Sequence, residues 1–230
     1  MTNQGGHPRH AVVTGASSGI GAAIADRLLR EGWTVTGLSR TDPGGRGGGF
    51  LHRAVDLLDP AALAPAVEGL RPTAVVHAAG FMRTAPLGAL DPEAGRQMWQ
   101  LHVEVASRLA DALVPGMADG GRVVLVGSRT AAGAAGRSQY AATKAALVGM
   151  ARSWAAELAP RGITVNVVAP AATDTPMLRD PGRSGVAPRL PPIGRLIEPA
   201  EIAALTAFLL GPEAGAITGQ QIVVCGGSSL

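Results

Sequence analysis

Short apolar runs alternate along this chain with longer segments in which apolar residues recur at helical spacing. Brief apolar runs bounded by turn residues predict buried strands, and the longer periodic segments predict helices. The predicted strands cover residues 10–14, 34–39, 51–55, 73–77, 122–126, 164–168 and 221–224. The predicted helices cover residues 22–31, 60–70, 91–117, 140–159 and 199–210.

Strands that alternate with helices predict a parallel sheet covered on both faces. Right-handed crossovers then give a Rossmann-type, doubly wound α/β fold with seven parallel strands, in which ligands bind outside the carboxyl ends of the strands. A chain of 230 residues suits one such domain, which we expect over 10–230 after a flexible N-terminal tail over 1–9. The proline-rich, aperiodic segment at about 171–197 is expected to act as a lid.

The first predicted strand leads into a glycine-rich loop and then into a helix. Gly15, Gly19 and Gly21 would let the backbone approach a phosphate closely, and the start of a helix favours negative charge. The spacing Gly-x-x-x-Gly-x-Gly differs from the Gly-x-Gly-x-x-Gly fingerprint of dinucleotide-binding folds. Taken alone, the loop is compatible with nucleotide binding or with an ordinary tight turn.

Arg40 follows the second predicted strand, directly after Ser39. In NAD-preferring folds an acidic residue near this point takes the ribose hydroxyls, whereas an arginine suits the 2′-phosphate of NADP. The pair therefore favours NADP, with NAD the less expected cofactor. The alternative is an arginine that is simply solvated at the end of a strand.

A second chemical pattern opens the predicted helix 140–159, where Tyr140 and Lys144 stand four residues apart. Residues at this spacing share one face of a helix. A free phenol has a pKa of about 10, and a neighbouring ammonium lowers that pKa toward the working range of an acid or base. Ser128, on a loop after the fifth predicted strand, can add a hydrogen bond to the same oxygen. The alternative for the pair is an ordinary surface contact.

Composition excludes several classes of function. The net charge is +3, but the basic residues are dispersed, and binding of nucleic acid is not expected without a basic patch. No apolar run approaches about 18 residues, so no membrane association is expected. Cys225 is the only cysteine, which excludes an intrachain disulfide and agrees with a cytoplasmic protein. No metal site is predicted.

The motifs that carry most information occur in a fixed order. They are Thr14-Gly-Ala-Ser-Ser-Gly-Ile-Gly21, Asp56, Ala79-Gly80, Ser128, Tyr140-x-x-x-Lys144, Asn166, Pro170, Thr173 and Gly226-Gly227. Together they resemble the short-chain dehydrogenase/reductase family, single-domain NAD(P)-dependent oxidoreductases. The likeness spans about residues 10–228 and is closest to the branch that contains 3-oxoacyl-carrier-protein reductases and many ketone and alcohol oxidoreductases.

The resemblance implies a role for each matching residue. Tyr140 would exchange a proton with the substrate oxygen, Lys144 would lower the pKa of that phenol and bind the nicotinamide ribose, and Ser128 would position the substrate oxygen. The residues implied in cofactor binding are Gly15, Ser17, Ser18, Ile20, Gly21, Ser39, Arg40, Asp56, Leu57, Ala78, Ala79, Gly80, Tyr140, Lys144, Pro170 and Thr173.

The chain departs from the family pattern at four points. His77 stands where the family often has asparagine, and His102 stands where many members carry an asparagine that holds a proton-relay water. Because histidine titrates near neutrality, we expect His102 to be a fourth catalytic candidate, the alternative being a histidine packed within a helix. Ser128 lies one residue closer to Tyr140 than is usual, and Cys225 replaces an aspartate and is expected to be a buried small apolar residue.

These observations predict an NADP(H)-dependent oxidoreductase that interconverts a carbonyl and a secondary alcohol, with Tyr140 as the acid or base. The alternative is a nonenzymatic dinucleotide-binding sensor or scaffold of the same fold. The substrate would be a small carbonyl or alcohol, free or bound to a carrier protein that Arg129 and Arg137 could contact. The pairing of long helices in the family implies a homodimer or homotetramer.

Overall fold

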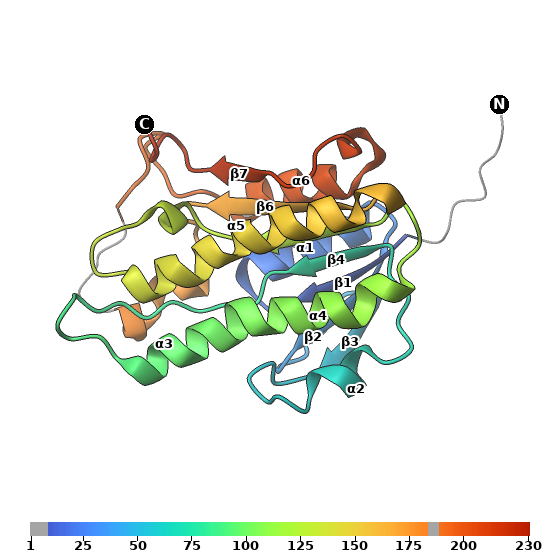
Figure 1. Ribbon diagram of the computed structural model, residues 1–230, viewed down its shortest axis with the longest axis horizontal. Coiled ribbons are helices and arrows are strands. Elements are labelled where there is room, and N and C mark those ends of the chain that lie inside the picture. Colours follow the sequence, from blue (N-terminus) through green and yellow to red (C-terminus); the bar gives the residue numbers. More distant parts are fainter. Residues whose placement is uncertain (1–8, 184–188) are drawn as a thin grey trace.

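Seven parallel strands form one sheet in the order β3-β2-β1-β4-β5-β6-β7, and the predicted doubly wound α/β fold is confirmed (Figure 1). The computed structural model describes residues 9–183 and 189–230. The strands are β1 (His10–Thr14), β2 (Thr34–Ser39), β3 (Phe50–Ala54), β4 (Ala74–His77), β5 (Arg122–Val126), β6 (Thr164–Pro170) and β7 (Gln221–Val224). Strand β6 continues beyond its predicted end to Pro170, because Pro170 pairs in register with Val224 of the edge strand.

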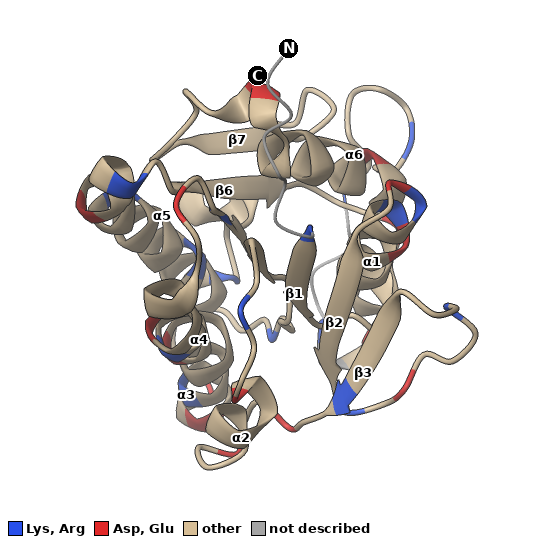
Figure 2. Cartoon of the chain, turned by 90° about the vertical axis from the view of Figure 1, so that its right-hand side faces the viewer, with Lys and Arg blue, Asp and Glu red and all other residues tan. Residues whose placement is uncertain are grey.

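Two layers of helices cover the sheet (Figure 2). Helices α1 and α6 lie together on one face, and α2, α3, α4 and α5 lie on the other. The helices are α1 (Gly19–Arg30), α2 (Leu63–Val67), α3 (Pro92–Trp99), α4 (Val105–Leu113), α5 (Ser138–Leu158) and α6 (Pro199–Leu210).

Alternate residues of the central strands bury their side chains in opposite layers. Val12 and Val75 belong to the core beneath α2, α4 and α5, whereas Val13 and Val76 belong to the core beneath α1 and α6. Aromatic residues form only 3% of the chain, so these cores consist mainly of valine, leucine, isoleucine and alanine. A strand buried on both faces appears in sequence as a continuous apolar run, which is why the central strands were predictable.

The helix predicted over 91–117 is divided by a π-helical segment, Gln100–Glu104, between α3 and α4. A π-helical turn inserts an extra residue into the helical hydrogen-bond pattern and often marks a functional site. Here Leu101 in this segment accepts a hydrogen bond from His77 of β4, with Nε2 and O 3.1 Å apart. The irregularity therefore joins the helix to the carboxyl end of a central strand.

The predicted tail and lid lie partly outside the described residues. Residues 1–8 of the tail are outside them, while Arg9 packs over the Trp33 ring with its guanidinium 5.4 Å from the ring centroid. Residues 184–188 of the lid are also outside, and the described part forms two short turns, Pro176–Arg179 and Pro181–Arg183. No helix in the described ranges is long and apolar enough to cross a membrane. The homodimer or homotetramer stays a prediction.

Candidate active site

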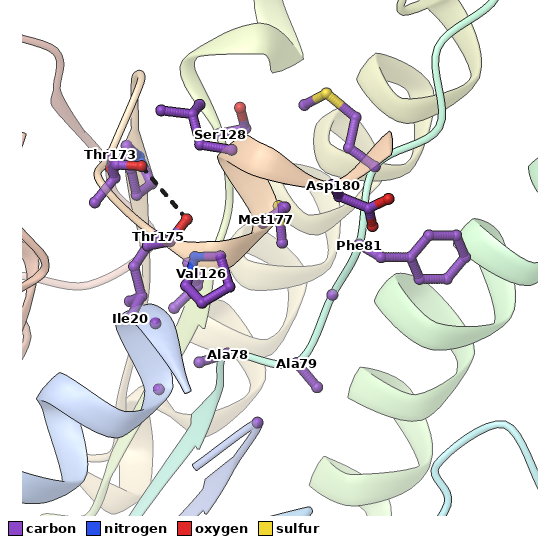
Figure 3. Close-up of a pocket in the computed structure, with 18 of the residues that line it drawn as sticks. Ile20, Ala78, Ala79, Phe81, Val126, Ser128, Thr173, Thr175, Met177 and Asp180 are labelled. Carbon is purple, nitrogen blue, oxygen red and sulfur yellow. Dashed lines mark hydrogen bonds between the residues drawn. The ribbon is translucent and has the colours of Figure 1, made fainter. Parts of the chain in front are cut away.

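The carboxyl ends of β1, β2, β4, β5 and β6 open into one cleft with a volume of about 1170 Å³. Figure 3 shows side chains from α1, β5, the loop after β4 and the segment after β6 converging on part of this cleft. Every residue that the sequence suggested for catalysis or cofactor binding lines it. These are Gly15, Ser17, Ser18, Ile20, Gly21, Ser39, Arg40, Asp56, Leu57, Ala78, Ala79, Gly80, His102, Ser128, Tyr140, Lys144, Pro170 and Thr173.

The glycine loop between β1 and α1 forms a backbone cradle. Gly15 adopts a φ of 68°, and a Cβ added there would lie 2.9 Å from Ala79 Cα. A Cβ on Gly21 would lie 2.2 Å from Gly15 O, so only glycine lets α1 start this close to the loop. No side chain caps the start of α1, which leaves its first N–H groups free at the cleft. This cradle fits the pyrophosphate of a dinucleotide.

The end of the cleft at the loops after β2 and β3 carries the residues predicted to hold the adenosine. Arg40 is exposed after β2 and forms no ion pair with any carboxylate in the described ranges. The Ser39 hydroxyl donates to the carbonyl two residues on at 3.0 Å, and the Asp56 carboxylate accepts from the N–H two residues on at 3.0 Å. Leu57 is buried in the core and supplies an apolar wall. The free guanidinium suits a phosphate.

His77 and Thr14 close a hydrogen-bond network beneath the cleft floor. Because His77 Nε2 donates to the Leu101 carbonyl, its Nδ1 accepts from the Thr14 hydroxyl at 3.0 Å. The Thr14 oxygen in turn accepts the N–H groups of Ala78 and Ala79, each at 3.0 Å. Burial lowers the pKa of His77 to about 3, which keeps the ring neutral. His77, which stands where the family often has asparagine, is thus a structural residue with hydrogen bonds at both ring nitrogens.

His102 lies fully buried in the π-helical segment with both ring nitrogens occupied by protein groups. Its Nε2 accepts from the Phe81 N–H at 3.2 Å, so the ring proton is on Nδ1, which lies 2.8 Å from the Thr143 hydroxyl. Thr143 donates onward to the Tyr140 carbonyl at 2.8 Å. Burial lowers the pKa of His102 well below its ordinary value. The predicted proton-relay role stays a prediction, and this geometry favours a positioning role.

Tyr140 and Ser128 present their hydroxyl groups to the cleft from α5 and from the turn after β5. Ser128 is buried, and its Oγ accepts from the Thr130 N–H at 3.1 Å, which fixes the side chain. Burial raises the pKa of Tyr140, while a hydrogen bond with the Ser128 side chain and the charges of Arg183 and Arg137 lower it. The short spacing between the serine and the tyrosine is therefore absorbed by the loop.

Lys144 lies one turn further along α5 and is the only lysine of the chain. Its Nζ donates to the Val126 carbonyl at 2.9 Å and lies 5.8 Å from the centroid of the Tyr140 ring. Burial lowers the pKa of Lys144 itself to about 7. The sequence predicted that this ammonium lowers the phenol's pKa; in the structure burial of the phenol dominates and raises its pKa.

The segment predicted as a lid supplies several residues of the substrate end of the cleft that were not singled out as site residues. Thr175, Met177 and Asp180 reach it from the segment after β6 (Figure 3), and Thr175 donates to the Thr173 carbonyl at 3.4 Å. This segment has no periodic pattern, and only its proline content signalled a functional loop.

Cys225 is half-buried after β7 rather than buried, because it follows an edge strand.

Comparison with known proteins identifies the family. The family model described as Enoyl-(Acyl carrier protein) reductase matches residues 15–229. The chain is 36% identical to the 3-oxoacyl-[acyl-carrier-protein] reductase FabG of Salmonella typhimurium, covering 94% of this chain and 96% of that protein. It is also 36% identical to the short-chain reductase protein NovJ of Streptomyces niveus, covering 94% and 92%.

Solved structures give the same result. A short-chain dehydrogenase/reductase from Serratia marcescens matches with a TM-score of 0.86 and 34% identity, covering 97% of this chain and 100% of that one. A blue fluorescent protein from a metagenomic library, in complex with NADPH, matches with a TM-score of 0.86 and 31% identity, covering 96% and 98%. The fold, the cleft and these relatives together show that the chain belongs to the short-chain dehydrogenase/reductase family and is an NAD(P)-dependent oxidoreductase.

Proposed function

We propose that the protein is an NADP(H)-dependent oxidoreductase that interconverts a carbonyl and a secondary alcohol, with Tyr140 as the acid or base. The observation that carries this proposal is the burial of Ser128, Tyr140 and Lys144 in the cleft that also contains the glycine cradle. A hydroxyl pair held beside a dinucleotide site can bind one substrate oxygen. When bound, NADPH would supply the hydride, and that chemistry belongs to the cofactor.

The residues of the chain would manage the proton. In reduction, the Tyr140 Oη–H donates its proton to the carbonyl oxygen as that oxygen becomes an alcohol. Ser128 holds the same oxygen by a hydrogen bond, and Lys144 sits behind the phenol where it can bind a ribose hydroxyl. Since burial raises the pKa of Tyr140, the phenol is protonated at neutral pH and is ready to act as the acid. Oxidation needs the phenolate, so it should accelerate as the pH rises.

The names of the FabG relatives support a 3-oxoacyl substrate for this chain. Such a group could enter as a free molecule or as a thioester on a carrier protein. Carrier proteins are acidic, and the arginines at the cleft could contact one. Activity on the carrier-bound form would then fall steeply with added salt, whereas activity on a small free substrate would change little.

Arg40 is the basis for choosing NADP over NAD, and its substitution tests the cofactor assignment. We expect Arg40→Ala to weaken NADPH binding roughly tenfold or more, because a charge-assisted contact to the 2′-phosphate is lost, and to leave NADH binding almost unchanged. Fluorescence titrations of purified protein with the two cofactors in parallel measure both constants. Arg30→Ala, an exposed arginine of α1 outside the cleft, is the matched control. An equal loss for both cofactors would remove the NADP assignment.

A further inference from the structure

Three arginines stand at the substrate end of the cleft without an acidic partner. Arg137 is the residue directly before α5, Arg183 ends the second short turn after β6, and Arg129 begins the turn after Ser128. All three line the cleft and are half-buried. Within the described ranges none of them forms an ion pair with a carboxylate. No carboxylate of the described residues therefore neutralises their charges by an ion pair.

Two of these guanidinium groups also carry buried, unsatisfied donors. Arg137 Nε and Arg183 Nε are both buried and have no hydrogen-bond partner among residues 9–183 and 189–230. Arg183 Nη1 makes a long contact of 3.4 Å with the Met177 carbonyl, and no hydrogen bond is formed by the Arg137 side chain within the described part of the chain. A buried donor without a partner costs stability, and such groups are uncommon in native proteins.

Two other arginines that line the same cleft, in contrast, have carboxylate partners. Arg83 pairs with Asp180 at 2.9 Å, and Arg179 pairs with Asp174 at 2.5 Å. The chain thus neutralises two other arginines of this cleft with carboxylates. Asp180, which pairs with Arg83, directly precedes in sequence the turn that ends in Arg183.

The unpaired charges act on one another and on the reacting hydroxyl. Burial lowers the pKa of Arg137, and the charges of Arg183 and Arg129 lower it further, so Arg137 is repelled by both of these neighbours. The charges of Arg183 and Arg137 also lower the pKa of Tyr140. Their positive field therefore covers the place where the substrate oxygen would bind. A cluster of like charges in a half-buried site is stabilised when an anion enters it.

We infer that the substrate carries an anionic group, a carboxylate or a phosphate, which Arg137 and Arg183 bind beside the reacting carbonyl. This inference rests on the proposed function, because it names the substrate class for the same site. The planar fork of a guanidinium matches an oxyanion through paired N–H donors, and the free Nε atoms supply one donor each. Arg129 adds charge at the rim. This site is separate from Arg40, which lies at the opposite, adenosine end of the cleft.

Paired substrates that differ only in charge provide the test. The kcat/KM for NADPH-dependent reduction of acetoacetate and of its neutral methyl ester would be measured for the wild type, Arg137→Gln and Arg183→Gln. We expect the wild type to prefer the acid by kcat/KM at least about tenfold, and each substitution to lower that value for the acid about 10- to 100-fold with less than about threefold change for the ester. Arg96→Gln, which removes an exposed arginine of α3 paired with Glu93, controls for net charge and should change neither.

A binding measurement keeps the inference testable when turnover is slow. Acetoacetate cannot be reduced by NADP⁺, so calorimetric titration of the NADP⁺-saturated protein with acetoacetate reports binding alone. Inorganic phosphate and dihydroxyacetone phosphate serve as the phosphate probes in the same titration. We expect an anion to bind to the wild type and to Arg96→Gln, and at least tenfold more weakly to Arg137→Gln and Arg183→Gln. The carboxylate and phosphate arms then show which anion the site prefers.

The outcomes separate the two proposals. Reduction of the ester as fast as the acid, with equal effects of the arginine substitutions on both, would overturn the anionic substrate and leave the oxidoreductase intact. Arginine-dependent anion binding without reduction of any carbonyl would support the anion site and count against the proposed reaction. Absence of arginine-dependent binding for every anion would also overturn the inference.

Discussion

Lys144 shows how a single side chain is specified by its surroundings. It is the only lysine among twenty basic residues, and the chain uses arginine at every other cationic position. A guanidinium stays charged in a protein, whereas an ammonium can lose its proton when buried. Lys144 is buried with one carbonyl partner, and burial lowers its pKa from 10.5 to about 7. The cation at this position can therefore become neutral, which an arginine could not.

The stability of the cofactor-free protein should reflect this lysine. Below about pH 7 both folded and unfolded chains bind the proton, and the folded state bears the full cost of the buried charge. Between about pH 7 and 10 the unfolded chain holds one more proton than the folded chain, so the free energy of unfolding rises with pH. Lys144→Met should raise the free energy of unfolding at pH 6 by about 2–4 kcal/mol, and this gain should vanish near pH 10.

Chemical denaturation of both proteins at the two pH values measures this difference. A chain with one lysine also gives one side-chain signal in an NMR titration of lysine-labelled protein. That signal should titrate near pH 7. A midpoint at the ordinary value for lysine, together with a pH-independent effect of the substitution, would contradict this description of Lys144.

At the scale of elements, the sequence predicted the strands well and the interruption of one helix not at all. Strands β1, β4 and β5 are continuous apolar runs because both faces of each are buried, and the loop that follows each was predictable. The π-helical segment has no periodic signal, since it depends on His77 and His102, which bond to groups far away in sequence. The tautomers of these two histidines likewise depend on their partners and could not be predicted from spacing.

His102 joins three elements, and its substitution distinguishes positioning from proton relay. It connects the π-helical segment to the loop at Phe81 and to α5 at Thr143. We expect His102→Asn to lower the free energy of unfolding by about 1–3 kcal/mol, because buried hydrogen bonds are lost. The rate should fall, but the midpoints of its pH profile should not move, because a neutral His102 does not titrate in the working range.

Thr143→Val is the matched control for this contact between the π-helical segment and α5. It removes the partner of His102 Nδ1, together with the hydrogen bond that the Thr143 hydroxyl donates to the Tyr140 carbonyl, and should reproduce part of the stability loss, again with unmoved pH midpoints. Loss of a titration limb in His102→Asn, with a stability close to that of the wild type, would instead support the proton relay.

At the scale of the whole molecule, sheet order assembles the site. Strands β1, β4, β5 and β6 are neighbours, although β1 and β6 lie far apart in sequence, so the loops after them meet at one edge. Motif spacing and this topology were enough to predict that the glycine loop, Ser128, Tyr140 and Lys144 line one cleft, while the roles of these residues stay predictions. The shape of the substrate end was not predictable, because Arg183 belongs to an aperiodic segment whose path depends on contacts such as Arg83 with Asp180.

One substitution tests most directly the proposal that Tyr140 carries carbonyl reduction in a protein that binds NADPH. Purified wild type and Tyr140→Phe would be compared for NADPH consumption over a panel of 3-oxo acids, their esters and their thioesters, with NADPH affinity measured by fluorescence. We predict that the wild type reduces a member of the panel, and that Tyr140→Phe loses about 10²- to 10⁴-fold in rate with NADPH affinity within about threefold. Equal rates for the two proteins would contradict the claim.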